Sequence, residues 1–282
     1  METHTEAQPA APQAEQKMVF AETDRIVIGT PCYGGNVKQE YLTSYVATLL
    51  HITVPVRIEG SNAPTYMPII AEGMFLDKES HIDRARNKVA NRFLLTPYQW
   101  LLMVDSDIVW PIEAVARLWQ HGMSGHKIVC APYALKGILP QFAINAVKGT
   151  RPNELGLVDA MHGGTGFMLI HRSVFEAMAA GGLAPEYSLG SNDPDLHTLK
   201  TSRAYFKSGV RRVPEADKTL WLSEDYMFCH EWRSLGGHVM IDTKIVLEHI
   251  GDCKYPVDPA QTFMAAREFR RINHPACPVE LV

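Results

Sequence analysis

The stretch Trp100-Leu-Leu-Met-Val-Asp-Ser-Asp107 decides the expected fold of this 282-residue chain. Its five apolar residues have the length of a buried β-strand, and two carboxylates follow the strand at once. Side chains two residues apart at a strand end point the same way, so Asp105 and Asp107 are able to converge on one hard cation that prefers oxygen ligands. In the alternative interpretation, these acidic residues only end the strand and solvate the turn. Because open α/β sheets place ligands at the carboxyl ends of their strands, the first interpretation predicts a site at this edge.

Strands and helices are expected to alternate on both sides of this stretch. Apolar runs predict strands at residues 25–29, 54–59, 100–104, 127–131, 166–170 and 244–247. Helical spacing predicts helices at residues 41–50, 82–95, 112–119 and 226–235, the last closed by a glycine pair, and a capping-box pattern predicts another that begins at 173–176. The alternation indicates an α/β fold with a mainly parallel central sheet and helices on both faces. Residues 183–220 show no clear period and are expected to form a long insertion, functional or mobile.

The composition is that of a globular protein, with 46% hydrophobic and 21% charged residues. A formal net charge of -4 excludes a general attraction to nucleic acid or anionic membranes, and no apolar run is long enough to span a bilayer. Residues 1–19 are rich in Ala, Gln, Glu and Pro and lack the features of a secretory signal, so we expect a disordered tail before a single domain over 20–282. Five scattered cysteines without a CxxC pair indicate neither a zinc site nor a disulfide framework, and we expect a cytoplasmic location.

Five further segments carry a resemblance to a known family. They are, in chain order, Ile26-Val-Ile-Gly-Thr-Pro-Cys-Tyr33, Asp83-Arg-Ala-Arg-Asn87, His162-Gly-Gly-Thr-Gly166, Ser223-Glu-Asp225 and His249-Ile-Gly251. With the DxD motif at 105–107, they resemble the glycosyltransferases of the nucleotide-diphospho-sugar transferase superfamily, which have the Rossmann-like GT-A fold. The segment at 83–87 is similar to the RARN-type helix of the Anp1/Mnn9-like mannosyltransferases. The resemblance covers roughly residues 25–251. It implies transfer of a sugar from a nucleotide-diphosphate donor, with UDP favoured over GDP, to a hydroxyl acceptor.

The resemblance also implies roles for individual residues. Asp105, Asp107 and His249 would hold Mn²⁺ or Mg²⁺, and the imidazole favours manganese. The donor would contact Thr30, Pro31, Tyr33, Arg86, Asn87, Asp105, Gly163 and Gly164, with Asn87 either reading the nucleotide or bracing the loop. Asp225 would be the general base of an inverting transfer, and Glu224 beside it would orient the acceptor or the sugar. The RARN-type relatives are regarded as retaining enzymes, so the stereochemistry stays open.

Each of these residues also has a purely structural interpretation. Arg84 and Arg86 fit a solvated helix face, and the glycine pair at 163–164 fits an unusual backbone turn. Ser223 fits a helix N-cap, and acids in a first helical turn complement the helix dipole. A lone histidine such as His249 is more often structural than a metal ligand.

The acceptor is not identified by the sequence. Residues 200–212 contain five basic residues, two aromatic residues and no acid. This fits a phosphate-rich acceptor such as modified DNA or a lipid-linked diphosphate, and equally a donor-covering loop or a solvated surface. Trp221 fits stacking on a sugar or base as well as core packing, and His162 is a weaker candidate contact.

Two other functions compete with the transferase. A nucleotidyltransferase acting on sugar phosphates usually has a basic, glycine-rich loop after its first strand, but only Lys38 follows Gly34-Gly35 here. A non-catalytic carbohydrate-binding protein would have no need for both Asp105 and Asp225.

Overall fold

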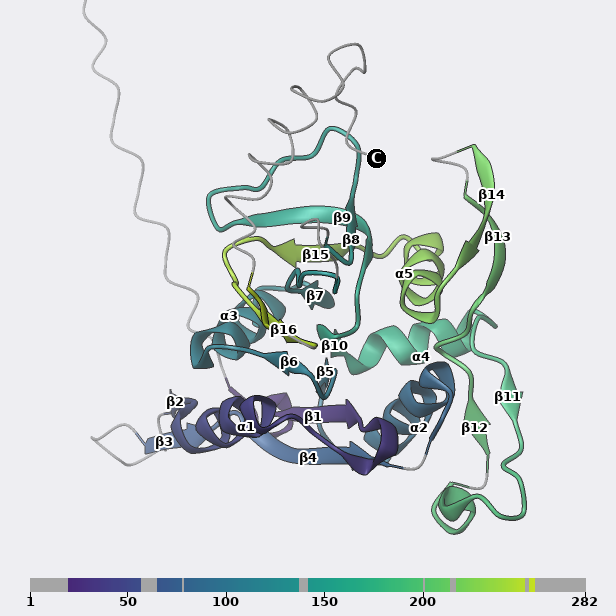
Figure 1. Ribbon diagram of the computed structural model, residues 1–282, viewed down its shortest axis with the longest axis horizontal. Coiled ribbons are helices and arrows are strands. Elements are labelled where there is room, and N and C mark those ends of the chain that lie inside the picture. Colours follow the sequence, from purple (N-terminus) through teal and green to yellow (C-terminus); the bar gives the residue numbers. More distant parts are fainter. Residues whose placement is uncertain are drawn as a thin grey trace, which may run out of the picture.

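The computed structural model describes residues 20–56, 65–77, 79–136, 142–199, 201–213, 217–251 and 254–256. Its centre is an eight-stranded sheet in the order β4-β1-β5-β10-β7-β15-β9-β8 (Figure 1). The strands are β1 (Ile26–Pro31), β4 (Ile70–Leu76), β5 (Trp100–Val104), β7 (Ile128–Cys130), β8 (Ile144–Ala146), β9 (Leu157–Gly163), β10 (Phe167–His171) and β15 (Val239–Asp242). Six of them run in one direction, and β9 and β10 run in the other. The α/β class with a mainly parallel, Rossmann-like sheet is confirmed.

Helices cover both faces of this sheet, as predicted. Helices α1 (Gln39–His51) and α3 (Ile112–Met123) pack on one face, and α2 (Ile82–Leu94), α4 (Arg172–Ala180) and α5 (Glu224–Ser234) pack on the other. All five residues of β5 are buried, and successive side chains serve opposite faces. Leu102 and Val104 pack in the core between the sheet and helices α1 and α3. Leu101 and Met103 pack in the core on the opposite face, beneath α2, α4 and α5. A strand that is buried on both faces has a continuous apolar sequence, so β5 could be predicted from the sequence.

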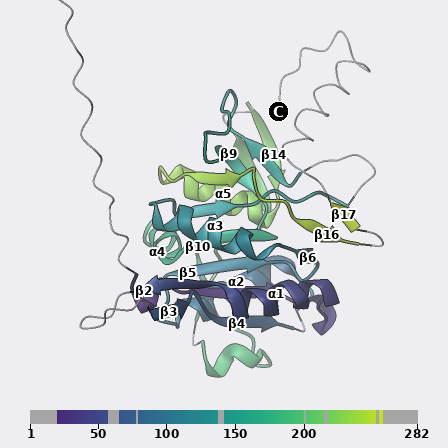
Figure 2. The same ribbon diagram turned by 90° about the vertical axis from the view of Figure 1, so that its left-hand side faces the viewer.

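Smaller elements surround the central sheet. Strands β2 (Thr53–Val56) and β3 (Thr65–Pro68) pair with each other beside α1 (Figure 2). Strands β6 (Ile108–Val109), β16 (Glu248–Ile250) and β17 (Lys254–Pro256) form a three-stranded sheet. Short 3-10 turns lie at Glu22–Asp24, Tyr33–Gly35 and Pro194–His197.

The strand predicted at 54–59 is only partly confirmed. The described strand β2 begins at Thr53 and pairs with β3 rather than joining the central sheet, and residues 57–59 lie outside the described residues. The place beside β1 belongs to β4, which the sequence analysis did not predict. Its exposed side chains interrupt the apolar run, because β4 is the edge strand of the sheet. The tail predicted at 1–19 also lies outside the described residues.

Two local predictions were wrong. Residues 244–247 do not form a strand: a turn at 243–244 includes Lys244, whose backbone N–H donates to the Asp242 carboxylate at 2.9 Å, and residues 245–247 have no regular structure. The strand follows at β16. Helix α4 does not begin with a capping box at Ser173, because the imidazole of His171 occupies the N-cap position and accepts the backbone N–H of Ser173 at 3.2 Å.

The insertion at 183–220 has more regular structure than predicted. Strands β11 (Glu186–Tyr187) and β12 (Ser202–Arg203) pair antiparallel, and so do β13 (Gly209–Val213) and β14 (Lys218–Leu222). Each pair is short and partly exposed, so it carries no apolar period that a sequence would reveal.

Candidate functional site

A pocket of about 210 Å³ lies at the carboxyl ends of β1 and β5. The two strands are parallel neighbours, so their ends meet at one edge of the sheet. The end of β1 contributes Pro31, and the loop after it contributes Cys32 and Tyr33. The turn after β5 contributes Asp105, Ser106 and Asp107. Other segments contribute Glu79, Ser80, Ile82, Ala85 and His249. The predicted residues Pro31, Tyr33, Asp105, Asp107 and His249 are therefore brought together around one pocket.

The loop after β1 is shaped by glycine. Gly34 and Gly35 have φ of 68° and 73°, in the left-handed region that other residues rarely adopt. This turn leaves the ring of Tyr33 79% exposed at the rim of the pocket. The backbone N–H of Lys38 then donates to the carbonyl of Ser106 at 3.0 Å, which ties this loop to the DxD turn.

His249 reaches the pocket through strand pairing. It lies opposite Ile108 in the β6–β16 ladder, and its Nε2 lies 3.5 Å from Oδ2 of Asp107. The carbonyl of Ala134 only accepts, so the 2.7 Å contact to Nδ1 places a proton on that nitrogen. The Nε2 atom is then the one directed at Asp107.

Asp107 also has a lysine partner. The Nζ of Lys136 lies 2.6 Å from its Oδ2. Burial alone would raise the pKa of Asp107, but His249 and Lys136 outweigh burial and lower that pKa to about 2. Asp107 is therefore an ionised carboxylate at neutral pH.

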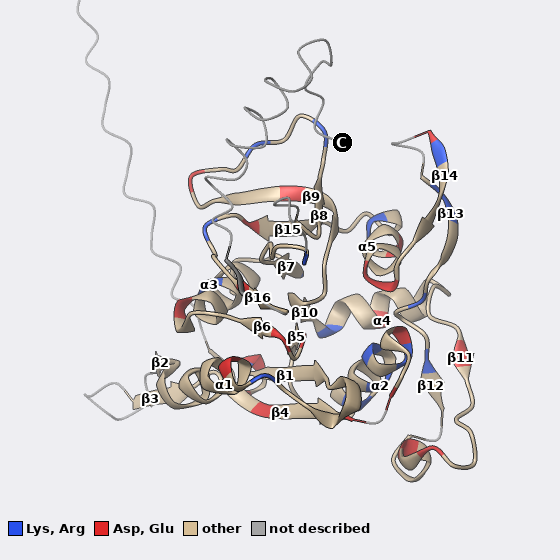
Figure 3. Ribbon diagram, viewed as in Figure 1, with Lys and Arg blue, Asp and Glu red and all other residues tan. Residues whose placement is uncertain are grey.

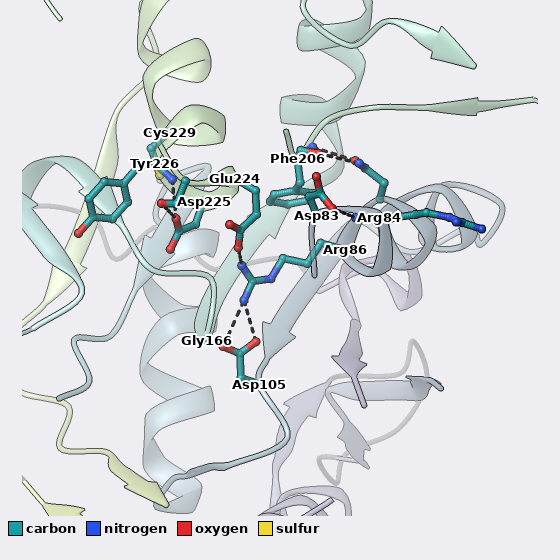
Figure 4. A network of polar contacts seen from close by, with 12 residues as sticks. Asp83, Arg84, Arg86, Asp105, Gly166, Phe206, Glu224, Asp225, Tyr226 and Cys229 are labelled. Atoms are coloured by element: carbon teal, nitrogen blue, oxygen red, sulfur yellow. Dashed lines mark hydrogen bonds and ion pairs between the residues drawn. The ribbon is translucent and has the colours of Figure 1, made fainter. Parts of the chain in front are cut away.

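Arg86 joins the three central motifs (Figure 4). Arg86 is 4% exposed. Its Nη2 donates to both carboxylate oxygens of Asp105, at 2.9 and 3.1 Å, and its Nη1 donates to Glu224. Burial would lower the pKa of Arg86, but the charges of Asp105 and Glu224 prevail and raise it. Helix α2, the DxD turn and the start of α5 therefore meet at one buried cation. This excludes the interpretation of Arg86 as part of a solvated helix face.

The two acids of the Ser-Glu-Asp segment differ in environment. Glu224 is 8% exposed, and burial raises its pKa even though Arg86 acts against this. Asp225 is partly exposed, and its Oδ1 accepts from the Ser223 hydroxyl and from the backbone N–H of Tyr226 at 2.8 Å. Ser223 is at the N-cap position of α5 as predicted, but its hydroxyl bonds Asp225 instead of capping the helix. Both acids lie in the first turn of α5, where the ribbon is red in Figure 3.

Asn87 does not line the pocket. Its amide donates to the carbonyl of Phe206 at 2.6 Å, and its carbonyl oxygen accepts the N–H of Phe206 at 2.8 Å. Asn91, one turn further along α2, bonds the backbone of Arg203 in the same two-way manner, with both distances 2.9 Å. These contacts brace the insertion against α2. Of the two roles predicted for Asn87, the structure shows the bracing contact.

An ionic network holds a second part of the insertion against α2. Asp193 accepts from Arg84 and from Lys88 at 3.0 Å each, and Glu79 contacts the same two cations at 3.0 and 3.2 Å. Arg92 adds a pair with Asp195. Because Glu79 also lines the pocket, this network connects the pocket wall to the insertion.

Three other predicted donor residues lie beneath the surface. Thr30 is fully buried, and its hydroxyl bonds that of Tyr41 at 2.5 Å. A Cβ added to Gly163 would meet the sulfur of Cys130 at 2.8 Å, and one added to Gly164 would meet the hydroxyl of Tyr133 at 2.3 Å. Neither glycine has a positive φ, so both are needed for close packing rather than for an unusual turn.

The backbone of this glycine segment is also occupied. The N–H of Gly164 donates to the carbonyl of Ala143 at 2.8 Å, so it is not available to a donor in this arrangement. The neighbouring His162 is 5% exposed and stacks on Tyr226 with ring centroids 4.7 Å apart.

Two site residues were missed by the sequence analysis. Glu79 lies in a segment without regular structure, and Lys136 follows an irregular stretch after β7. Neither belongs to a motif or to a periodic segment, so no sequence signal distinguishes them from other surface charges. Their roles follow only from the approach of distant segments.

The described residues also include a candidate metal-binding pair. Within the described ranges, no group of three His, Cys, Asp or Glu side chains is arranged to hold a metal ion. Asp107 and His249 nevertheless combine an oxygen and an imidazole donor, and the Nδ1–H of His249 bonds a carbonyl, as metal-bound histidines usually do. A carboxylate has about four acceptor positions, so Asp105 has capacity beyond its contact with Arg86. These donors fit a divalent cation.

Comparison with known proteins shows the fold and no more. No family model matches the chain. No curated protein matches it either. A crystal structure of A197 from STIV is similar, with a TM-score of 0.51 and 16% sequence identity, over 84% of this chain and 91% of that chain. In all, 157 solved chains match, so this is a widely used fold whose presence does not identify a function. Across the described part of the chain, no helix is long and apolar enough to cross a membrane.

Proposed function

We propose that this protein is a divalent-cation-dependent glycosyltransferase that transfers a sugar from a nucleotide-diphosphate donor, UDP-linked in preference to GDP-linked, to a hydroxyl acceptor. One observation carries the proposal. The buried guanidinium of Arg86 joins Asp105 of the DxD turn to Glu224 of the Ser-Glu-Asp segment, beside a pocket that also contains Asp107 and His249. Fold similarity alone would not support this assignment, because one fold hosts many functions.

Donor binding is assigned to the pocket. The exposed ring of Tyr33 presents an aromatic face to the nucleoside base, and Pro31 and Cys32 form the wall beneath it. Asp107 and His249, together with Asp105, would hold Mn²⁺ or Mg²⁺. When bound, such an ion neutralises the charge that develops on the departing diphosphate.

Proton transfer is assigned to Asp225. Ser223 and the N–H of Tyr226 both bond its Oδ1, which fixes the carboxylate and directs the other oxygen towards an acceptor hydroxyl. That oxygen takes the hydroxyl proton as the acceptor attacks the anomeric carbon, and a direct displacement of this kind inverts the configuration. Glu224 is neutralised by Arg86, so we assign it to positioning rather than to proton transfer.

The test is thermal stability with Mn²⁺ and each of UDP, GDP, CDP and dTDP, for the wild type and for Asp107→Asn. A ligand at a hundredfold excess over its Kd stabilises the native state by about 2.7 kcal/mol. We expect one diphosphate to raise the melting temperature only when the metal is present, and Asp107→Asn to lose this response. Asp217→Asn, which changes an 89% exposed carboxylate that pairs with the exposed Arg212, is the matched control and keeps the response.

Hydrolysis of the corresponding nucleotide sugar completes the test. Release of free sugar that requires metal and Asp225 supports the transferase. If no nucleotide changes the melting temperature, with or without metal, the proposal fails and a carbohydrate-binding protein becomes the better explanation.

A further inference from the structure

The hairpin of β13 and β14 presents one packed face and one open face. It stands on α5 at the side of the molecule (Figure 1). Val213 and Leu222 are buried against Met227 of α5. Arg211 points the same way and approaches Glu231 of α5 at 3.8 Å. These contacts anchor the inner face of the hairpin.

The opposite face, here called the outer face, consists of Val210, Arg212, Thr219 and Trp221. Val210 pairs with Trp221 and Arg212 pairs with Thr219 in the antiparallel ladder, so the four side chains lie on one side. Trp221 is 70% exposed and Val210 is 55% exposed. Core packing is therefore excluded for Trp221. By contrast, Trp100, Trp110 and Trp119 lie in the core and are 2–3% exposed.

The outer face continues into the candidate catalytic residues. Side chains alternate along the extended chain, so Leu222 points inward while Trp221 and Ser223 share the outer side. Ser223 has extended backbone angles, φ -64° and ψ 168°, which carry the alternation to the start of α5. The Ser223 hydroxyl bonds the Asp225 carboxylate. Trp221 and Ser223 are therefore about 6.7 Å apart along the extended chain.

The charges around this face do not favour an anionic partner. Acidic neighbours pair with the described basic side chains of the segment 200–212. The pairs are Arg203 with Glu186, Lys207 and Arg211 with Glu231, and Arg212 with Asp217, while Lys200 lies outside the described residues. Among the described residues of this segment, no row of unpaired cations remains to follow a phosphate backbone.

We propose that the outer face of the hairpin is the acceptor site, and that the indole of Trp221 stacks on the C–H face of a neutral sugar ring of a glycan acceptor. The face of an aromatic ring is electron-rich and attracts the weakly positive C–H groups on one side of a hexose. Arg212 and Thr219 beside the indole offer hydrogen-bond donors to the ring hydroxyls. The inference rests on the proposed function, because it takes Asp225 as the base that the acceptor hydroxyl must reach.

The test uses the full-length chain and a panel of neutral oligosaccharides terminating in glucose, galactose, mannose or N-acetylglucosamine, with a single-stranded oligonucleotide as the comparison. Binding is measured by titration calorimetry for the wild type, Trp221→Ala, Trp221→Phe and Leu220→Ala. We expect Trp221→Ala to weaken binding of one oligosaccharide by roughly tenfold and Trp221→Phe by about threefold or less, because the smaller ring still stacks. Leu220→Ala, on the inner side of the same strand, is the matched control and leaves binding unchanged.

Three outcomes would overturn the inference: no oligosaccharide binds, Trp221→Ala binds as the wild type does, or the oligonucleotide binds through Trp221 instead. Nucleotide-dependent melting of the wild type, measured in parallel, distinguishes this failure from failure of the proposed function. A protein that responds to a nucleotide and metal but binds no sugar retains the transferase assignment and loses this acceptor site. A protein with Trp221-dependent sugar binding and no nucleotide response loses the transferase assignment instead.

Discussion

Replacement of Arg86 by methionine tests whether one buried cation holds the candidate site together. The side chains of its partners Glu224 and Asp105 are 11% and 26% exposed. Removing one partner of a buried ion pair costs about 3–5 kcal/mol, because the remaining charge is left without compensation. Most of this cost falls on Glu224, since a partly exposed carboxylate such as Asp105 loses at most about 1 kcal/mol. We therefore expect Arg86→Met to lower the free energy of unfolding by about 3–5 kcal/mol.

A second substitution separates the charge effect from lost packing. Glu224→Gln in the Arg86→Met background removes the stranded charge, and we expect it to restore up to about 3 kcal/mol, the upper range for coupled residues in contact. Arg86→Lys keeps a positive charge but loses the planar fork that reaches both carboxylates, so an intermediate loss is expected. Urea unfolding at neutral pH measures all four proteins, and the midpoints are comparable as long as the slope of the transition is unchanged.

The free energy of unfolding that Arg86→Met loses should depend on pH. Without Arg86, burial raises the pKa of Glu224 further above its value in the unfolded chain. The native variant then binds more protons than the unfolded chain between these two pKa values, so its stability falls as pH rises through the folded pKa. The deficit of Arg86→Met should be largest near neutral pH and smaller in acid. A loss below about 1 kcal/mol, or a double variant no more stable than Arg86→Met alone, would refute the proposed buried network.

Three further predictions follow from other parts of the structure. Gly164→Ala should cost about 1–3 kcal/mol, because the new methyl group meets a tyrosine hydroxyl at 2.3 Å; Gly190→Ala, with no neighbour within 4 Å, should change the urea midpoint little, and equal losses would contradict the packing argument. Burial lowers the pKa of His171 to about 4, below its value in the unfolded chain. The neutral ring caps α4, so the native protein loses stability as pH falls towards that value. His171→Asn keeps a cap that does not titrate, and its melting temperature should fall less than that of the wild type between about pH 7 and pH 4.5; parallel curves would exclude this role. Lys136→Met removes an ammonium group 2.6 Å from Asp107, and Mn²⁺ affinity measured by calorimetry should rise about tenfold; unchanged or weaker binding would show that the lysine does not compete with the ion.

Much of the architecture was predictable because the relevant signals are local. The five residues of β5 are apolar throughout, and the apolar positions Ala85, Val89 and Phe93 of α2 recur at helical spacing. Both patterns follow from burial on known faces of a regular element. The glycine pair after α5 was equally informative, because Gly236 adopts a φ of 83° and ends the helix with a Schellman motif to Trp232 and Arg233. The edge strand β4 and the short pairs of the insertion were not predictable, since partly exposed strands have no comparable pattern.

Local sequence patterns were enough to predict that a DxD turn follows a buried strand, that Arg86 lies on a helix, and that Glu224 and Asp225 begin another helix. They did not determine the partners of these residues. Arg86 would have the same sequence context on a solvated face, and only the convergence of α2, β5 and α5 makes it a buried counter-ion.

The same distinction applies to Asn87 and His249. Asn87 bonds Phe206 because the insertion folds back on α2, and His249 faces Asp107 because β16 pairs with β6. The local apolar pattern records which residues are buried, since burial acts on each side chain separately. Polar partners are set by the distance between segments far apart in the chain, and that distance exists only once the sheet and its helices have packed.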